Sequence, residues 1–116
     1  MDKRIPENRL TFTIFVIKPP TMFAFFSVYL KPMEEVDCHL EAHRLFLKSL
    51  YEKGITICSG PQIPRTGGFI LLNASGKDEA LEIMANDPYV IHEVARYTVI
   101  EFECRSCAEG FRQFVM

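Results

Sequence analysis

Two titratable residues, His43 and Asp87, are the first candidates for chemistry in this sequence. His43 falls in the apolar stripe of an amphipathic helix, which repeats at steps of four and three residues. The stripe consists of Val36, Leu40, His43, Leu47 and Leu50. An imidazole can move a proton to or from a substrate when a second group orients one of its nitrogens. The structural alternative is a core histidine whose nitrogens bond to nearby backbone.

Asp87 is the candidate orienting group, and it stands in the stretch "NDPYV". A carboxylate can fix the tautomer of an imidazole and stabilise its protonated form. Asp87 followed by Pro88 is also the pattern of a helix N-cap with proline at the first helical position. The two residues lie far apart in the sequence, so spacing alone does not bring them together.

Length and composition predict one globular domain. The chain has 116 residues, of which 48% are apolar and 24% charged, and its net charge is −2. This length supports one core. No cluster of Lys and Arg stands out, which argues against a nucleic-acid partner.

The four cysteines, Cys38, Cys58, Cys104 and Cys107, are too sparse for a disulfide-stapled secreted domain. We expect reduced thiols and a cytoplasmic protein. Cys104 and Cys107 form a lone CxxC, which is half of a zinc site, so we predict no metal and no cofactor.

Residues 1–21 precede the first predicted strand of the domain. Two apolar runs, residues 11–17 and 22–30, are split by Lys18, Pro19 and Pro20, and each is much shorter than the roughly 20 residues that a membrane span requires. The stretch meets only part of the pattern of a signal peptide. We therefore expect no membrane association and an extension or extra strand over residues 1–21.

Hydrophobic patterning predicts the remaining elements. The expected strands are residues 22–30, 55–60, 68–74 and 96–104. One helix is expected from about residue 33 to residue 53, ending at Gly54, and a second within residues 76–88. A further helical turn follows Pro88. The tail, residues 105–116, is compatible with a short helix.

This order predicts an α+β fold of the ferredoxin-like, split βαβ type: a βαββαβ antiparallel sheet with both helices on one face. The predicted parts are an extension (1–21), the ferredoxin-like domain (22–104) and a tail (105–116). Strand 22–30 is apolar on both faces, so a second copy of the chain is the natural cover for the open face. Two sheets facing each other form a dimeric α+β barrel.

The sequence resembles the YciI-like (YCII-related) family. The matching pieces are "HRLFLKSLYEKGITICSGP", "GGFILLNASGKDEALEIMANDPYV" and "VARYTVIEF", in the family's order, and they lie within residues 22–103. The resemblance implies a ferredoxin-like fold, a dimeric α+β barrel and a catalytic pair formed by His43 and Asp87. Relatives of this barrel isomerise lactones or eliminate halide from aromatic catabolites, which implies lyase or isomerase chemistry.

Substrate contacts are less defined. Family members often carry arginine three residues before the histidine, where this chain has Leu40. Arg44 adjoins His43 and is expected to point to another side of the helix. Arg65, in the loop after Gly60 and Pro61, is the remaining candidate cation, and these three are the predicted substrate-binding residues.

Several other motifs favour structural roles. His39 is expected to face solvent, and His92 has no predicted partner. Gly67 and Gly68 lack the lysine and the helix of a phosphate loop, so a turn with positive φ is the preferred interpretation.

Two functions remain open from sequence. The leading one is a homodimeric small-molecule enzyme that uses His43 and Asp87 for proton transfer on an unidentified substrate. The alternative is a non-catalytic barrel that binds a small ligand or a partner, with His43 as a structural residue. A free ring nitrogen facing a pocket distinguishes the first from the second.

Overall fold

The structure, a computed structural model, describes residues 21–115. The extension predicted for residues 1–21 therefore lies outside the described residues except for Thr21. The strands are β1 (Thr21–Tyr29), β2 (Thr56–Pro61), β3 (Gly68–Asn73) and β4 (Ala95–Glu103). The helices are α2 (Met33–Asp37), α3 (Leu40–Glu52), α4 (Lys77–Met84), α5 (Pro88–Ile91) and the 3₁₀ helix η1 (Glu109–Phe114).

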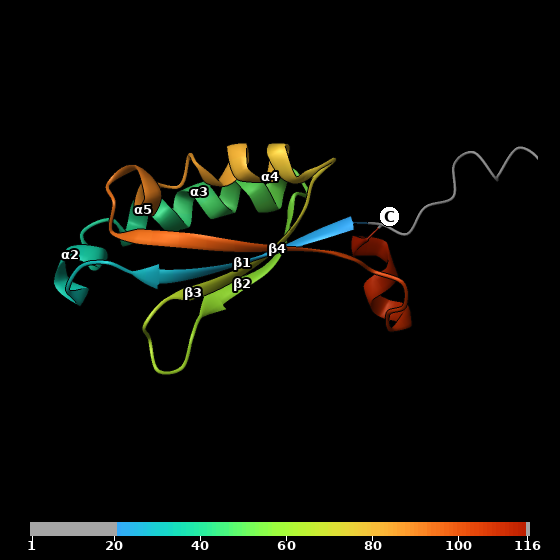
Figure 1. The fold of residues 1–116 in the computed structure, drawn as a ribbon, viewed down its shortest axis with the longest axis horizontal. Coiled ribbons are helices and arrows are strands. Elements are labelled where there is room, and N and C mark those ends of the chain that lie inside the picture. Colours follow the sequence, from blue (N-terminus) through green and yellow to red (C-terminus); the bar gives the residue numbers. More distant parts are fainter. Residues whose placement is uncertain (1–20, 116) are drawn as a thin grey trace, which may run out of the picture.

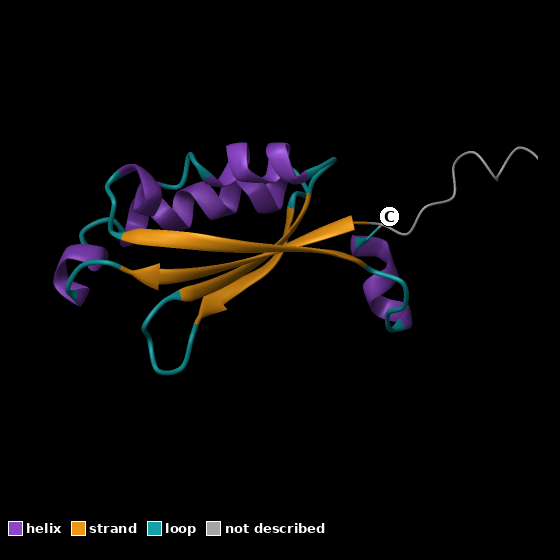
Figure 2. Ribbon diagram, in the orientation of Figure 1, coloured by secondary structure: helices purple, strands orange, loops and turns teal. Residues whose placement is uncertain are grey.

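The four strands form one antiparallel sheet in the order β2-β3-β1-β4. Helices α3, α4 and α5 all lie over the same face of this sheet (Figure 1; Figure 2). This is the ferredoxin-like arrangement, so the predicted α+β fold class is confirmed. The division of the chain into residues 1–21, 22–104 and 105–116 stays a prediction. None of the helices between residues 21 and 115 has the length and apolarity needed to cross a membrane.

The core lies between the central strands and the helices. Alternate residues of a strand point to the same face, and the helix-facing set of β1 and β3 is apolar. The buried cluster consists of Phe23, Phe25, Leu50, Ile70, Leu72, Ala80 and Met84. Each large side chain in it contributes about 1.5–3 kcal/mol by leaving water. This packing fixes α3 against the sheet.

The single helix predicted for residues 33–53 is wrong: the structure has two helices, α2 and α3. The break falls at His39, whose backbone is non-helical (φ −110°, ψ 10°). It allows Val36 to join a second buried cluster with Tyr89, Val94 and Ala95, while α3 covers the main core. The predicted end of α3 is confirmed, because Gly54 has φ 73° and closes a Schellman motif.

Position 67 requires glycine because its backbone lies very close to the backbone of Ser27, and not because it forms a turn with positive φ. This corrects the sequence-based interpretation. A Cβ atom added at Gly67 would lie 1.8 Å from the backbone oxygen of Ser27. The next residue, Gly68, donates its backbone N–H to Ser27 Oγ at 2.7 Å. The loop between β2 and β3 is thereby held against β1.

We expect Gly67→Ala to lower the free energy of unfolding by about 1–3 kcal/mol, because backbone must move to admit the methyl group. Urea unfolding measures the change. Gly76→Ala is the control, since an added Cβ at Gly76 meets no atom within 4 Å. Equal stability of Gly67→Ala and the wild type would contradict the close approach.

Candidate active site

Asp87 occupies the turn between α4 and α5, where it is completely buried. It is the N-cap of α5: its Oδ1 accepts the backbone N–H of Tyr89 at 3.0 Å, and Pro88 follows at the first helical position. The capping role predicted from the sequence is therefore confirmed. A buried carboxylate needs further donors, and the fold brings two side chains to it.

The first side chain that donates to Asp87 is His43, on the pocket-facing side of α3. Its Nδ1 lies 2.8 Å from Asp87 Oδ1. A carboxylate only accepts, so Nδ1 carries the proton and Nε2 keeps its lone pair in the neutral ring. The sequence could not place the two residues together; the packing of α3 against α5 does. Their catalytic role stays a prediction.

The second side chain that donates to Asp87 is Tyr97 of β4, which was not predicted from the sequence. Its hydroxyl donates to Asp87 Oδ2 at 2.6 Å. Burial, followed by the adjacent Asp87 carboxylate, raises the pKa of Tyr97 well above its usual value. The phenol therefore remains a donor throughout the neutral range, and both carboxylate oxygens are occupied by donors. Strand alternation groups Tyr97 with Val99 on one face of β4, but nothing in the sequence paired Tyr97 with Asp87.

The ring of His43 is held from a second direction by Tyr89. The two rings are parallel, with an interplanar angle of 1° and centroids 3.9 Å apart. Tyr89 is almost fully buried, so it is a fixed surface for the imidazole. The hydrogen bond to Asp87 and this stacking together restrict both torsions of the His43 side chain.

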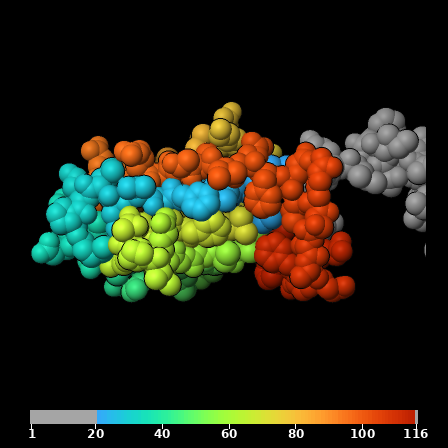
Figure 3. Space-filling model, turned by 60° about the horizontal axis from the view of Figure 1, so that its bottom comes forward, coloured from blue at the N-terminus to red at the C-terminus, as the bar shows by residue number. Residues whose placement is uncertain are grey.

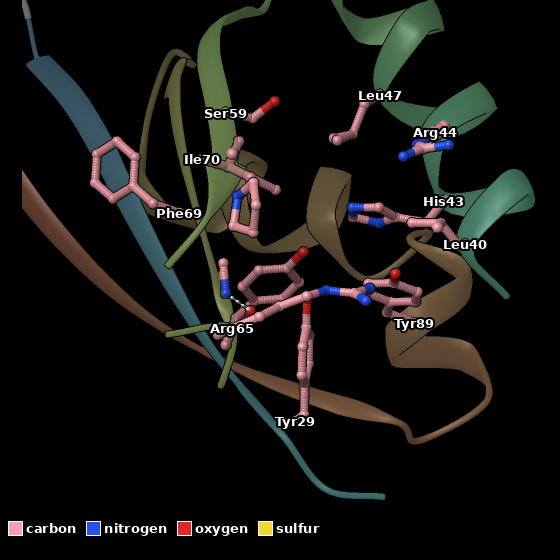
Figure 4. Close-up of a pocket in the computed structure, with 15 residues that line it drawn as sticks. Tyr29, Leu40, His43, Arg44, Leu47, Ser59, Arg65, Phe69, Ile70 and Tyr89 are labelled. Atoms are coloured by element: carbon pink, nitrogen blue, oxygen red, sulfur yellow. Dashed lines mark hydrogen bonds between the residues drawn. The ribbon is translucent and has the colours of Figure 1, made fainter. Parts of the chain in front are cut away.

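His43 lines a pocket of about 430 Å³ between α3 and the sheet (Figure 4). The His43 side chain is 14% exposed, and its Nε2 has no hydrogen-bond partner among residues 21–115. The predicted substrate-binding residues Gly60, Pro61 and Arg65 all line this pocket, although a role in binding substrate stays a prediction. The free nitrogen and the cavity satisfy the geometric requirement for a proton-transferring histidine.

Arg44 also lines the pocket, which corrects the expectation that it points elsewhere. Figure 4 shows it on α3 beside His43, next to the same cavity. The expectation failed because adjacent helical positions differ by only about 100°. A long arginine side chain spans that angle.

Arg65 reaches across the pocket from the β2–β3 loop. Its guanidinium donates to Asp37 Oδ1 at 2.9 Å and lies over the Tyr29 ring, 5.5 Å from the centroid. Asp37, and after it Tyr29, raise the pKa of Arg65 further above its ordinary value. Its charge is thus partly neutralised within the protein.

Two other histidines form a stacked pair that the sequence did not predict. His39 and His92 lie with ring centroids 4.0 Å apart at 14°. They join the start of α3 to the end of α5, the two helices that carry His43 and Asp87. Among residues 21–115 no group of three or more His, Cys, Asp or Glu side chains is arranged to hold a metal.

We expect Tyr97→Phe to lower the free energy of unfolding by about 1.5–3 kcal/mol, because Asp87 Oδ2 would lose a donor inside the protein. In the folded wild type, the pKa of Tyr97 is raised above that of an ordinary tyrosine. The contribution of Tyr97 to the free energy of unfolding is therefore fully present below pH 10, the ordinary pKa of tyrosine, and is lost as the pH rises above it.

The Tyr97→Phe variant should therefore lose less stability than the wild type between pH 9 and pH 11, which denaturant unfolding across that range measures. The control is Tyr51→Phe, which changes an exposed tyrosine. Identical pH dependence in the wild type and Tyr97→Phe would contradict the assigned bond.

The model of the family described as the YCII-related domain matches residues 22–103. No curated protein matches the sequence. Among solved structures, the fold is similar to 5-chloro-2-hydroxyhydroquinone dehydrochlorinase (TftG) from Burkholderia phenoliruptrix in complex with 2,5-dihydroxybenzoquinone. The TM-score is 0.61 and the identity 20%, over 71% of this chain and 93% of that one.

Proposed function

The chain belongs to the family of YCII-related domains, and from this premise we propose that it is a small-molecule enzyme in which His43 moves a proton to or from the substrate. Asp87 holds the His43 ring and stabilises its protonated form. The observation that carries the proposal is the contrast between the two ring nitrogens. Nδ1 bonds to Asp87, whereas Nε2 is unpartnered among the described residues on a ring that lines the pocket.

The buried carboxylate supports this assignment. Asp87 accepts from His43, Tyr89 and Tyr97, so both of its carboxylate oxygens already have donors within the protein. It is also absent from the pocket lining. Asp87 therefore acts on the substrate only through His43, and His43 is the group that meets the reacting atom.

The reaction class that we propose is proton transfer coupled to elimination or isomerisation. One protein with a similar fold is a dehydrochlorinase, whose name includes a chlorinated hydroxyhydroquinone. In such an elimination, one hydroxyl proton first moves to the ring carbon that carries chlorine, which gives a keto tautomer. A base then takes a second hydroxyl proton while chloride leaves that carbon with the electron pair of the carbon–chlorine bond. The ring becomes a quinone, and no external oxidant is needed. We assign the role of that base to His43 Nε2, and the unpartnered nitrogen on a pocket-lining ring supports the assignment.

The test is catalysis by the purified chain. With 5-chloro-2-hydroxyhydroquinone as substrate, chloride release and quinone absorbance are followed together. In parallel, NMR in deuterated water follows proton exchange at carbon atoms next to carbonyl groups in a set of small ring ketones and lactones. Turnover or exchange that requires His43 supports the proposal. A wild type that shows neither chloride release nor proton exchange would contradict the proposal.

We also propose that the enzyme is a homodimer formed through the sheet face that lacks helices. In Figure 3, β1, β3 and β4 lie side by side on this face without a helix over them. Its exposed apolar side chains include Phe26, Val28, Ile100 and Phe102, which are 38–52% exposed. An apolar sheet face of this kind is typical of an interface. A second copy offers the same surface, as closed two-fold symmetry requires.

We expect Ile100→Arg to convert the dimer to a monomer, because each interface would gain two buried charges. Sedimentation velocity measures the mass. The matched control is Leu45→Arg, at a leucine of α3 that is 60% exposed. A wild type that sediments as a monomer, or a dimer unaffected by Ile100→Arg, would contradict this interface.

A further inference from the structure

The pocket beside His43 is positively charged and has aromatic walls. Its charged lining residues are Arg44 and Arg65, in addition to the titratable His43. No aspartate or glutamate lines it, since Asp87 lies behind the imidazole. The aromatic surfaces come from Tyr29, Tyr89 and Tyr97. The Phe69 ring points away from the cavity (Figure 4).

The two arginines differ in how their charge is compensated. Arg65 is paired with Asp37 at 2.9 Å. Arg44 makes no ion pair with any acidic side chain in the part of the chain that the structure describes. Arg44 is exposed and lines the cavity, so its charge is available to an anionic group of a bound ligand.

A second, independent feature is the hydroxyl of Tyr89. Tyr89 lines the pocket and is 3% exposed, yet its hydroxyl has no hydrogen-bond partner among residues 21–115. Buried hydroxyls are normally bonded, and an unbonded one calls for a partner that the free protein lacks. The hydroxyl is protonated at neutral pH, because burial raises the pKa of Tyr89 by more than the nearby Arg65 guanidinium lowers it. A ligand oxygen would accept that donor.

Building on the proposed function, we propose that the substrates of this pocket are planar organic anions, whose charged oxygen is bound by Arg44 and which accept a further hydrogen bond from the Tyr89 hydroxyl. The ring of such a ligand packs among the tyrosines. The cavity of about 430 Å³ suits a single-ring compound. Arg44 is thus a specificity-determining residue, distinct from the proton-transferring His43.

The experiment compares two quinones by isothermal titration calorimetry. The probe is 2,5-dihydroxybenzoquinone, which is ionised at neutral pH, and its neutral match is 2,5-dimethoxybenzoquinone. We expect the wild type to bind the anion at least about tenfold more tightly, with an affinity that falls as salt rises. Arg44→Gln should lose about tenfold for the anion and less than twofold for the neutral quinone. Arg112→Gln, an exposed arginine of η1, should bind as the wild type does.

Tyr89→Phe gives a readout that a merely structural role would not move. It keeps the ring that stacks on His43 and removes only the unbonded hydroxyl. We expect the free variant to unfold at a higher temperature and to bind the anionic probe several-fold more weakly. A variant that binds the probe as tightly as the wild type would remove Tyr89 from the assignment.

Three results would overturn the anion assignment: equal affinity of the wild type for the two quinones, no binding of either, or full anion affinity in Arg44→Gln. Because binding is measured without turnover, the two proposals fail separately. A chain that binds the anion but turns over no substrate would contradict the proposed function alone. Turnover of neutral substrates by a fully active Arg44→Gln would contradict the anion assignment alone.

Discussion

Replacement of His43 by alanine is expected to lower kcat by about 10²–10⁴-fold, which is the usual contribution of a positioned acid or base. The variant loses the only imidazole that lines the described pocket, while Asp87 keeps its bonds to Tyr89 and Tyr97. The change should fall on kcat more than on KM, because Arg44 and the aromatic walls remain. Steady-state kinetics of the substrate identified by the chloride-release or exchange assay measure it.

His92→Ala is the control for the loss of a histidine. His92 is exposed and stacks on His39 outside the pocket lining, so its removal should leave kcat within about twofold of the wild type. Thermal unfolding of both variants verifies that the fold is kept. A His43→Ala enzyme with wild-type kcat would show that the ring is structural and would support the non-catalytic alternative.

Replacement of Asp87 by alanine is expected to lower the free energy of unfolding by about 3–5 kcal/mol. Three donors point at this carboxylate: the Tyr89 amide, the Tyr97 hydroxyl and His43 Nδ1. All three would lose their acceptor at a site that is completely buried. The start of α5 would also lose its cap. Denaturant unfolding measures the loss.

Asp87→Asn separates the stability effect from the catalytic one. The amide has nearly the same volume and can still accept from some of these donors, so the loss of stability should be smaller than for Asp87→Ala. Asparagine has no negative charge, and its NH₂ group can donate to His43 Nδ1. The proton of the neutral ring would therefore no longer be held on Nδ1. We expect kcat to fall by about 10²–10⁴-fold in a folded enzyme. Wild-type kcat in Asp87→Asn would remove Asp87 from the proposed mechanism.

Local features of the fold were predictable because the residues that determine them are neighbours in the chain. Gly54 marks the end of α3, and Asp87 with Pro88 marks the start of α5, through backbone bonds that span a few residues. Strand alternation gave β1 to β4 to within about two residues. The break between α2 and α3 was missed because it depends on where Val36 packs, which is a tertiary effect.

The site was only partly predictable for the same reason. His43 stood out because an imidazole interrupts an apolar stripe, and Asp87 because it precedes proline. Their contact required the family resemblance, since no periodicity relates α3 to the α4–α5 turn. Tyr97 was missed, because nothing in the sequence of β4 relates its hydroxyl to the Asp87 carboxylate. The need for glycine at Gly67 depends on the backbone of β1, far from it in sequence.

The tautomer of His43 is decisive for the proposed mechanism, and the ¹⁵N resonances of its ring report it by NMR at a pH where the imidazole is neutral. The claim is that Nδ1 donates to Asp87 and that Nε2 faces the pocket with a free lone pair. It predicts a protonated Nδ1, an unprotonated Nε2, and a shift of the Nε2 resonance when 2,5-dihydroxybenzoquinone is added. A ring protonated at Nε2 and insensitive to the ligand would contradict the account.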